Sequence, residues 1–205
     1  MTIRFHRQDL PDLSHYDVDA VAIDTETLGL NPHRDRLCVV QISPGDGSAD
    51  VIQIAAGQKK APNLVSLLRN RKITKLFHYG RFDLAVLHNA FGVMPEPVFC
   101  TKIASRLTRT YTDRHGLKDI CAELLGVSLS KVQQSSDWAA ETLTQEQLEY
   151  AASDVLYLHR LRDALSARLA RESRMEVADA CFRFLPTRSR LDLLGWPEDD
   201  IFAHS

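Results

Sequence analysis

Short apolar runs separated by turn-forming residues predict three strands in the first quarter of the chain. Residues 20–23 and 37–42 are β-branched apolar runs, and a Gly-Leu-Asn-Pro turn lies between them at 29–32. A Pro-Gly-Asp-Gly turn at 44–47 leads into a third run at 49–54. Because such short links join neighbouring strands, we expect the three to be antiparallel neighbours in one sheet.

After this region the pattern changes to alternating helical and strand-like segments. The last of them has a capping box at 144–147 and an apolar stripe from Ala151 to Leu169 at helical spacing. Antiparallel strands followed by such units and by terminal helices predict a mixed α/β sheet flanked by helices. Helices are expected at 62–70, 82–90, 116–125 and 144–171, and short strands at 73–78 and 98–100.

The size and charge of the chain limit its organisation and its partners. Its 205 residues, 44% of them hydrophobic, suit one globular domain spanning 1–205. The formal net charge of −2 excludes a polycation that coats nucleic acid. Any contact with nucleic acid must therefore be local, and a bound metal ion is a natural source of positive charge.

Cysteine spacing and the N-terminal composition point to a reducing compartment. Cys38, Cys100, Cys121 and Cys181 are far apart and form no C-x-x-C pair. Buried, reduced thiols are therefore expected, rather than zinc ligands or disulfides. The N-terminus lacks the apolar run of a signal peptide, and no stretch approaches the roughly 20 apolar residues of a membrane span. We expect a cytoplasmic protein with no membrane partner.

Two carboxylates at the end of the first predicted strand are the sharpest chemical signal. Asp24 and Glu26 are two residues apart, so in a strand their side chains project from the same face. They follow an apolar run in which negative charge is costly unless a cation binds. Oxygen ligands suit Mg²⁺ and Mn²⁺. The alternative is that both acids simply end the strand in solvent.

Two further acids are weak signals when each is taken alone. Tyr150 and Asp154 are four residues apart, which places them one turn apart on one face of a helix. Such a pair is also common on ordinary amphipathic helices. Asp83 lies early in a helix that follows a strand, where the helix dipole alone favours an acid.

Together, the order and context of these motifs resemble the DEDD superfamily of 3′-5′ exonucleases. Tyr150, four residues before Asp154, corresponds to the tyrosine subtype, because the histidine subtype has a His where this chain has Glu149. The resemblance implies a ribonuclease H-like fold, with three antiparallel strands, then parallel strands, and flanking helices. It covers about residues 18–170. Further stretches look like parts of ribonuclease D: 115–120, 124–127, 136–138 and 149–157.

The resemblance also implies a mechanism that uses two divalent cations, Mg²⁺ or Mn²⁺. Asp24 is expected to bridge both ions, with Glu26 and Asp154 beside the one that activates water. Asp83 is expected to act near the second ion through water. Tyr150 is expected to orient the nucleophilic water, and the products to be nucleoside 5′-monophosphates released from the 3′ end.

Five residues are candidates for substrate binding. By resemblance, Leu30 is expected to wedge between the terminal bases, although it also suits a turn packed on the sheet edge. Thr25 lies between the two strand acids, and His78, Tyr79 and Arg81 precede Asp83, where they are able to stack on a base or hold a phosphate. Plain core positions are the alternative for His78 and Tyr79.

Three further features bear on substrate and assembly. Residues 101–118 carry five Lys or Arg against one acid, which predicts either a phosphate-binding loop or a solvated connection. Only 51 residues follow Asp154, too few for the helical domains that follow the catalytic domain of ribonuclease D. The chain in this respect resembles the alphaproteobacterial nanoRNase C group, which degrades very short RNAs, including dinucleotides. That likeness implies a homo-oligomer, with an octamer as one size, and we expect the helical segment at about 172–205 to make subunit contacts.

Two alternatives remain beside an exoribonuclease acting on short single-stranded RNA. One is ribonuclease D-like trimming of tRNA 3′ ends, or action on single-stranded DNA. The other is a catalytically silent scaffold that binds nucleic acid. Complete retention of the four acids and Tyr150 argues against the scaffold.

Overall fold

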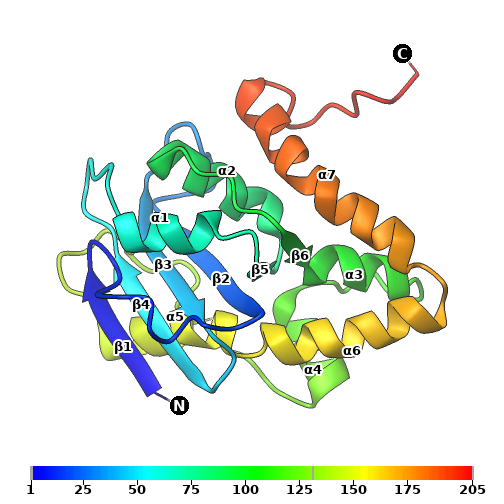
Figure 1. Ribbon diagram of the computed structural model, residues 1–205, viewed down its shortest axis with the longest axis horizontal. Helices are drawn as coiled ribbons and strands as arrows, with labels where there is room; N and C mark the ends of the chain where they lie inside the picture. Colours follow the sequence, from blue (N-terminus) through cyan, green and yellow to red (C-terminus); the bar gives the residue numbers. More distant parts are fainter. Residues whose placement is uncertain (1, 131, 205) are drawn as a thin grey trace.

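The protein folds around one six-stranded mixed sheet, seen in the computed structural model of Figure 1, which describes residues 2–130 and 132–204. Residues 1, 131 and 205, which the expected domain includes, lie outside the described residues. The strands are β1 (Thr2–Arg7), β2 (Ala20–Thr27), β3 (Leu37–Ser43), β4 (Ser48–Gln53), β5 (Thr74–Phe77) and β6 (Val98–Cys100). The helices are α1 (Pro62–Arg69), α2 (Gly80–Phe91), α3 (Thr101–Thr108), α4 (Leu117–Leu125), α5 (Gln145–Leu156), α6 (Leu158–Arg171) and α7 (Met175–Leu194).

The strand order is β1-β4-β3-β2-β5-β6. β2, β3 and β4 are antiparallel neighbours, and β5 and β6 extend the sheet in parallel beyond β2. This arrangement confirms the expected ribonuclease H-like order of three antiparallel strands followed by parallel ones. The expected strand boundaries are close to those observed because turn residues limit each apolar run.

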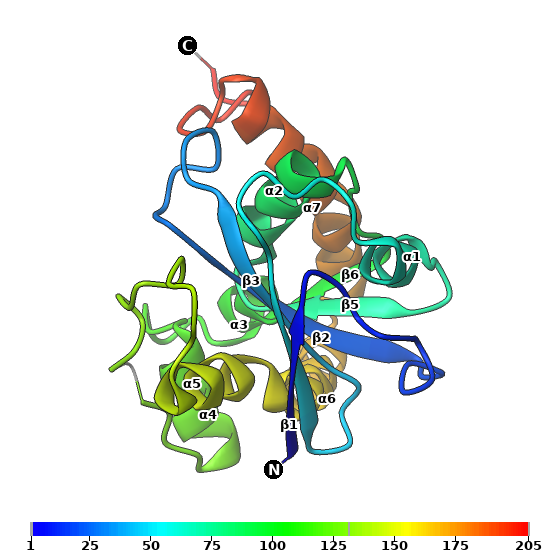
Figure 2. The same cartoon turned by 90° about the vertical axis from the view of Figure 1, so that its left-hand side faces the viewer.

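Helices cover both faces of the sheet. Every side chain of β3 is buried, and successive side chains of a strand point to opposite faces, so both faces must be covered. α5 packs against β1 to β4, and α2 packs against β2, β3 and β5 (Figures 1 and 2). The main apolar core is joined by a smaller cluster between the sheet and α5: Cys38, Val39, Val51, Trp138, Leu143 and Ala151.

Three elements differ from the expectations. The single helix expected at 144–171 is two helices, α5 and α6, which meet at Tyr157. The basic segment at 101–118 begins with α3, so only part of it is a loop. β1 was not expected, because it has no continuous apolar run, although Ile3 and Phe5 alternate with polar residues as in a half-exposed strand. It pairs in parallel with β4 at the edge of the sheet.

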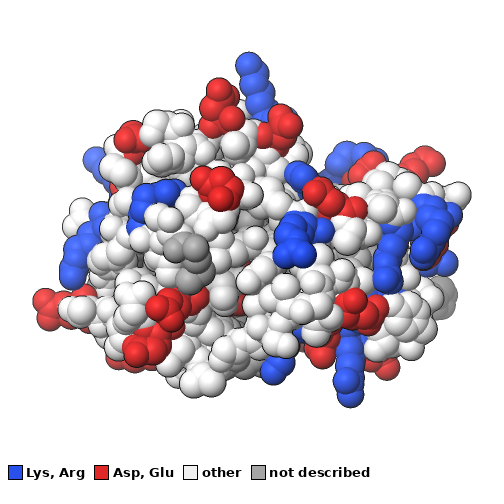
Figure 3. Space-filling view, turned by 90° about the horizontal axis from the view of Figure 1, so that it is seen from below, with Lys and Arg blue, Asp and Glu red and all other residues white. Residues whose placement is uncertain are grey.

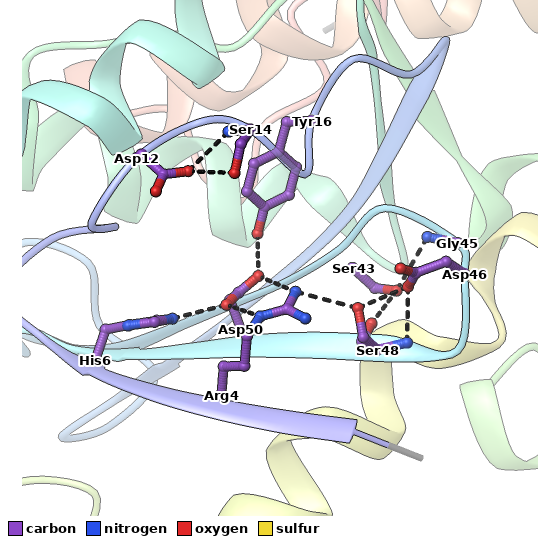
Figure 4. Close-up of polar contacts among 10 residues, drawn as sticks. All are labelled: Arg4, His6, Asp12, Ser14, Tyr16, Ser43, Gly45, Asp46, Ser48 and Asp50. Atoms are coloured by element: carbon purple, nitrogen blue, oxygen red, sulfur yellow. Dashed lines mark hydrogen bonds and ion pairs between the residues drawn. The ribbon is translucent and has the colours of Figure 1, made fainter.

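A buried acid holds β1 to β4. Asp50 is only 2% exposed, and it accepts hydrogen bonds from Arg4 (2.7 Å), His6 (2.7 Å) and the Tyr16 hydroxyl (2.5 Å) (Figure 4). Burial by itself raises the pKa of Asp50, but these donors outweigh it and hold the pKa below its usual range. The cluster shows how this fold stabilises a buried carboxylate when donors surround it.

The remaining general features are unexceptional. All four cysteines are free thiols, three of them buried and Cys181 half-buried. Acidic and basic side chains are interspersed on the face in Figure 3, with basic groups denser toward the end that carries α6. Within residues 2–130 and 132–204, no helix combines the length and apolar character needed to cross a bilayer.

Candidate active site

β2 and α5 bring three carboxylates together. Asp24 and Glu26 lie near the end of β2, and Asp154 lies in the last turn of α5, which packs against that strand. Carboxylate oxygens of all three are within 4.8 Å of one another. Residues separated by about 130 positions therefore converge, as the sequence motifs predicted.

Asp83 lies beside this cluster, in the first turn of α2. Its carboxyl is 3% exposed and accepts a 2.6 Å hydrogen bond from the Thr25 hydroxyl. It is outside the group of three, yet its charge contributes to raising the pKa of Asp24 and Glu26. Asp83 therefore lies farther from the centre of the carboxylate cluster than the other three acids do, which suits a less direct role.

The turn before α2 fixes where Asp83 lies. Tyr79 has a φ of +67°, which is rare for a residue with a side chain. At Gly80 a Cβ atom would lie 2.8 Å from the Cβ of Phe77, so only glycine fits there. The strand-to-helix turn is therefore tight, and strained backbone of this kind is concentrated at functional sites.

Burial and mutual repulsion make the ionised forms of the four acids unfavourable in this arrangement. Burial is the main cause that raises the pKa of Asp83 and of Asp154 to about 7. Burial, then repulsion from Asp154 and Asp83, raises the pKa of Glu26 to about 9. The pKa of Asp24 is also well above its usual range, because of burial and the three neighbouring acids. Among the described residues, no Lys, Arg or His forms an ion pair with any of them.

This chemistry fits a divalent cation. Clustered carboxylate oxygens are the ligands that hard cations such as Mg²⁺ prefer. A bound cation would offset the repulsion that raises the pKa values of Glu26 and Asp24. Asp50 differs from these acids, because hydrogen-bond donors of the protein itself stabilise its negative charge.

Gln41 is a neighbour of the cluster that the sequence motifs did not indicate. It pairs with Asp24 across β2 and β3, and its side-chain amide donates a 2.7 Å hydrogen bond to the Asp24 carboxylate. Gln41 is fully buried, so it fixes the orientation of that carboxylate. Only the register of the two strands reveals this contact, and the apolar pattern does not specify register to the residue.

Tyr150 lies one turn before Asp154 on α5, and its ring packs against Trp138 with 6.0 Å between centroids. Burial and the negative charges of Asp154, Glu26 and Asp24 raise the pKa of its hydroxyl. The phenol is therefore held in its protonated form next to the acids.

The candidate substrate-binding residues have different surroundings. Leu30 is 87% exposed in the loop after β2, and Tyr79 is 46% exposed with the Lys102 ammonium 4.2 Å from its ring centroid. His78 contacts the Thr101 hydroxyl at 2.9 Å, and burial lowers the pKa of its imidazole to about 3, so the ring is neutral. The Arg81 guanidinium forms a bidentate ion pair with Asp192. Their roles toward substrate stay predictions.

Known proteins share both the fold and the sequence pattern. The sequence profile of a 3′-5′ exonuclease family matches residues 11–170. Ribonuclease D of Acidiphilium cryptum is 35% identical over 156 residues, which are 76% of this chain and 39% of that protein. The chain thus spans well under half the length of such ribonuclease D relatives. The solved structure of Escherichia coli ribonuclease D is 28% identical, with a TM-score of 0.78, over 89% of this chain and 50% of that one.

The fold, the acidic cluster and the profile match define one class: the chain belongs to the 3′-5′ exonuclease family, whose members use divalent metal ions. Within that class it is highly similar to Brucella melitensis NrnC. The structure of NrnC with bound Mg²⁺ is 78% identical, has a TM-score of 0.97 and matches over 100% of both chains. NrnC bound to pGG gives 78% identity and a TM-score of 0.98, again over 100% of both chains. These matches confirm the predicted resemblance to ribonuclease D and to the nanoRNase C group.

Proposed function

We propose that this protein is a metal-dependent 3′-5′ exoribonuclease that hydrolyses short RNA, including dinucleotides, to nucleoside 5′-monophosphates. The observation that carries the proposal is the convergence of Asp24, Glu26 and Asp154, with their oxygens within 4.8 Å. Support for a short substrate comes from the similarity to NrnC, a protein whose structure has been solved bound to pGG. Either single-stranded RNA or DNA has the phosphodiester that such a site attacks, and we favour RNA on the strength of the relatives.

In this proposal each acid has a distinct task. Asp24, whose neighbouring acids are Glu26, Asp83 and Asp154, would hold both cations, and Glu26 and Asp154 would hold the one nearer the water. Asp83 is set back beside Thr25 and would act toward the second cation through water. When bound, two Mg²⁺ or Mn²⁺ ions stabilise charge on the phosphate and make the attacking water more acidic.

The other side chains position these groups. Gln41 fixes the Asp24 carboxylate, and Trp138 supports the ring of Tyr150. In the metal-free protein the raised pKa of Tyr150 keeps its hydroxyl protonated. With substrate bound, this hydroxyl would orient the attacking water through a hydrogen bond. Thr25, His78 and Tyr79 are proposed to line the path of the RNA, with Leu30 wedged between its terminal bases.

A time course on 5′-labelled RNAs of two to about twenty nucleotides tests the proposal. With Mg²⁺ or Mn²⁺ the label should move stepwise to shorter products, and the dinucleotide should disappear rapidly. Asp24→Asn should abolish cleavage, whereas Asp163→Asn, an exposed acid paired with Arg162, should not. Accumulation of dinucleotides would instead favour ribonuclease D-like trimming of longer RNA. No cleavage of any length would refute an exonuclease.

We also propose that residues 1–205 form one exonuclease domain that assembles into a homo-oligomer through the segment at about 172–205. Apolar groups exposed on α7 and beyond support this: Val177, Phe184, Leu194, Trp196, Ile201 and Phe202. Size-exclusion chromatography with light scattering should give a multiple of 23.1 kDa, with eight copies as the expected number. A monomer would refute it. The free thiols fit a cytoplasmic location, which we also propose.

A further inference from the structure

A short segment before α5 packs against the helix face that carries Tyr150 and Asp154. Gln147, Tyr150 and Asp154 are three and four residues apart on α5, so they share one face. The 137–144 segment, which forms no helix or strand, directly precedes this helix. In it Trp138 is 3% exposed, and its ring centroid lies 6.0 Å from that of Tyr150. The segment therefore contacts α5 where the candidate phenol lies.

The amide of Gln147 joins this segment to the first turn of α5. Its Nε2 donates a hydrogen bond to the backbone oxygen of Asp137 at 3.1 Å, one residue before Trp138. Its Oε1 accepts from the backbone N–H of Thr144 at 2.9 Å, as in a capping box. A capping box is completed by Glu as well as by Gln, so the contact of Nε2 with Asp137 is additional to capping.

Both halves of this amide are used in a place away from bulk water. Gln147 is 5% exposed, so a partner lost by its amide is not readily replaced by solvent. The Thr144 hydroxyl also accepts from the Gln147 backbone N–H at 3.2 Å. One buried residue thus caps the helix and fixes the segment that carries Trp138.

Gln53, the last residue of β4, holds the other side of the 137–144 segment. Its Nε2 donates to the backbone oxygen of Ala140 at 2.8 Å and to that of Glu141 at 3.4 Å. Leu143 belongs with Trp138 to the small apolar cluster between the sheet and α5. Side-chain amides from the helix and from the sheet therefore hold a segment that has no regular hydrogen-bonding pattern of its own.

We propose that Gln147 and Gln53 are positioning residues for the hydroxyl of Tyr150. They act through the 137–144 segment, which holds Trp138 against the phenol ring. The inference rests on the proposed exoribonuclease function, in which that hydroxyl orients the attacking water. A side chain keeps one orientation only if its neighbours lock it by packing, and a displacement of about 1 Å can lower a rate about 10²-fold.

This role is separate from metal binding. Within residues 2–130 and 132–204, the amides of Gln147 and Gln53 donate to backbone oxygens of the 137–144 segment and form no hydrogen bond with the four acids. The variants described next should therefore change the rate of the chemical step and leave the affinity for cations unchanged.

Gln147→Glu tests the proposal by replacing one amide nitrogen with oxygen. The new carboxylate still accepts from the Thr144 N–H, and the helix N-terminus favours its negative charge. It has no donor for the backbone oxygen of Asp137. With a dinucleotide and Mn²⁺, kcat should fall about 10-fold, whereas KM should change by less than about 2-fold. Calorimetry should give the wild-type affinity for Mn²⁺.

A double-mutant cycle separates positioning from a general structural role. In a Tyr150→Phe background there is no hydroxyl to position, so adding Gln147→Glu should lower kcat by less than about 2-fold. Gln145→Glu is the matched control, because it adds the same charge on an exposed side chain of the same helical turn. It should leave kcat unchanged in both backgrounds.

The outcomes distinguish this inference from the proposed function. If the wild-type protein cleaves no RNA, the proposed function fails. If it cleaves RNA, the inference alone is overturned by an unchanged kcat in Gln147→Glu, by an equal loss in both backgrounds, or by weaker Mn²⁺ binding. Thermal melting shows whether each variant is folded. Should Gln147→Glu not fold, Gln53→Glu decides by the same criteria, because it removes the donor to Ala140 on the other side of the segment.

Discussion

The buried position of Asp83 gives a quantitative prediction for the metal-free protein. Asp83→Asn keeps the shape of the side chain and an oxygen that accepts from the Thr25 hydroxyl, but it removes the ionisable group. Burial raises the pKa of Asp83 to about 7, whereas an unfolded Asp titrates near its model value of 3.8. A carboxyl whose pKa is raised by folding contributes stability at low pH, and this contribution is lost as pH rises toward the folded pKa.

The size of the effect follows from that shift. Each pKa unit corresponds to about 1.4 kcal/mol. When the pH rises from 5.5 to 8.5, the titration of Asp83 should therefore lower the free energy of unfolding of the wild-type protein by about 2 kcal/mol, and the variant should not show this loss. For a domain of this size that is about 4–8 °C in melting temperature. Groups whose pKa does not depend on Asp83, such as His78, cancel in the comparison. The pKa of Asp24 and of Glu26 falls when the charge of Asp83 is removed, which adds to the gain of the variant at high pH.

The assay is thermal or urea unfolding in EDTA at the two pH values. Relative to the wild type, the free energy of unfolding of the variant should increase by about 2 kcal/mol as the pH rises from 5.5 to 8.5. Asp35→Asn is the control, because hydrogen bonds from Arg34 and the Asn31 backbone lower the pKa of Asp35 to about 2. Its effect on stability should be similar at both pH values, since its own titration lies below this window. If Asp83→Asn shows no pH-dependent gain, the account of a costly acidic cluster is wrong.

Three further substitutions test the division of tasks. Tyr150→Phe should reduce turnover by about 10²-fold or more while calorimetry shows Mn²⁺ affinity unchanged, because the phenol acts on water rather than on the cation. Leu30→Ala should raise KM for the dinucleotide without changing metal affinity; an unchanged KM would remove Leu30 from the substrate site. Asp154→Ala should abolish turnover and weaken Mn²⁺ binding at least 10-fold, and full affinity in that variant would contradict its place among the ligands.

Much of the fold was predictable because short apolar runs and turn residues mark the central strands clearly. The three antiparallel strands and the capping box at Thr144 are local features, which can be recognised from the sequence alone. β1 was missed because an edge strand needs no continuous apolar run. The break at Tyr157 was missed because the apolar stripe continues across it from α5 into α6.

The candidate site also has parts that the sequence predicts and parts that it does not. Asp24, Glu26, Asp83 and Asp154 were identified from motif order, which reflects a shared chain path. The Gln41 contact with Asp24 depends on strand register, and the Arg81 contact with Asp192 joins residues 111 positions apart. No local pattern encodes such pairings, so the sequence does not reveal that Arg81, a candidate substrate-binding residue, forms an ion pair with Asp192.

The most direct test of the central claim is release of nucleotides from an RNA dinucleotide, followed by chromatography that separates 5′- from 3′-monophosphates. With Mg²⁺ the dinucleotide should be converted completely to products that include a nucleoside 5′-monophosphate, EDTA should stop the reaction, and excess Mg²⁺ should restore it. Cleavage that persists in EDTA, or products ending in 3′-phosphates, would contradict a site in which these four acids hold cations against the scissile phosphate.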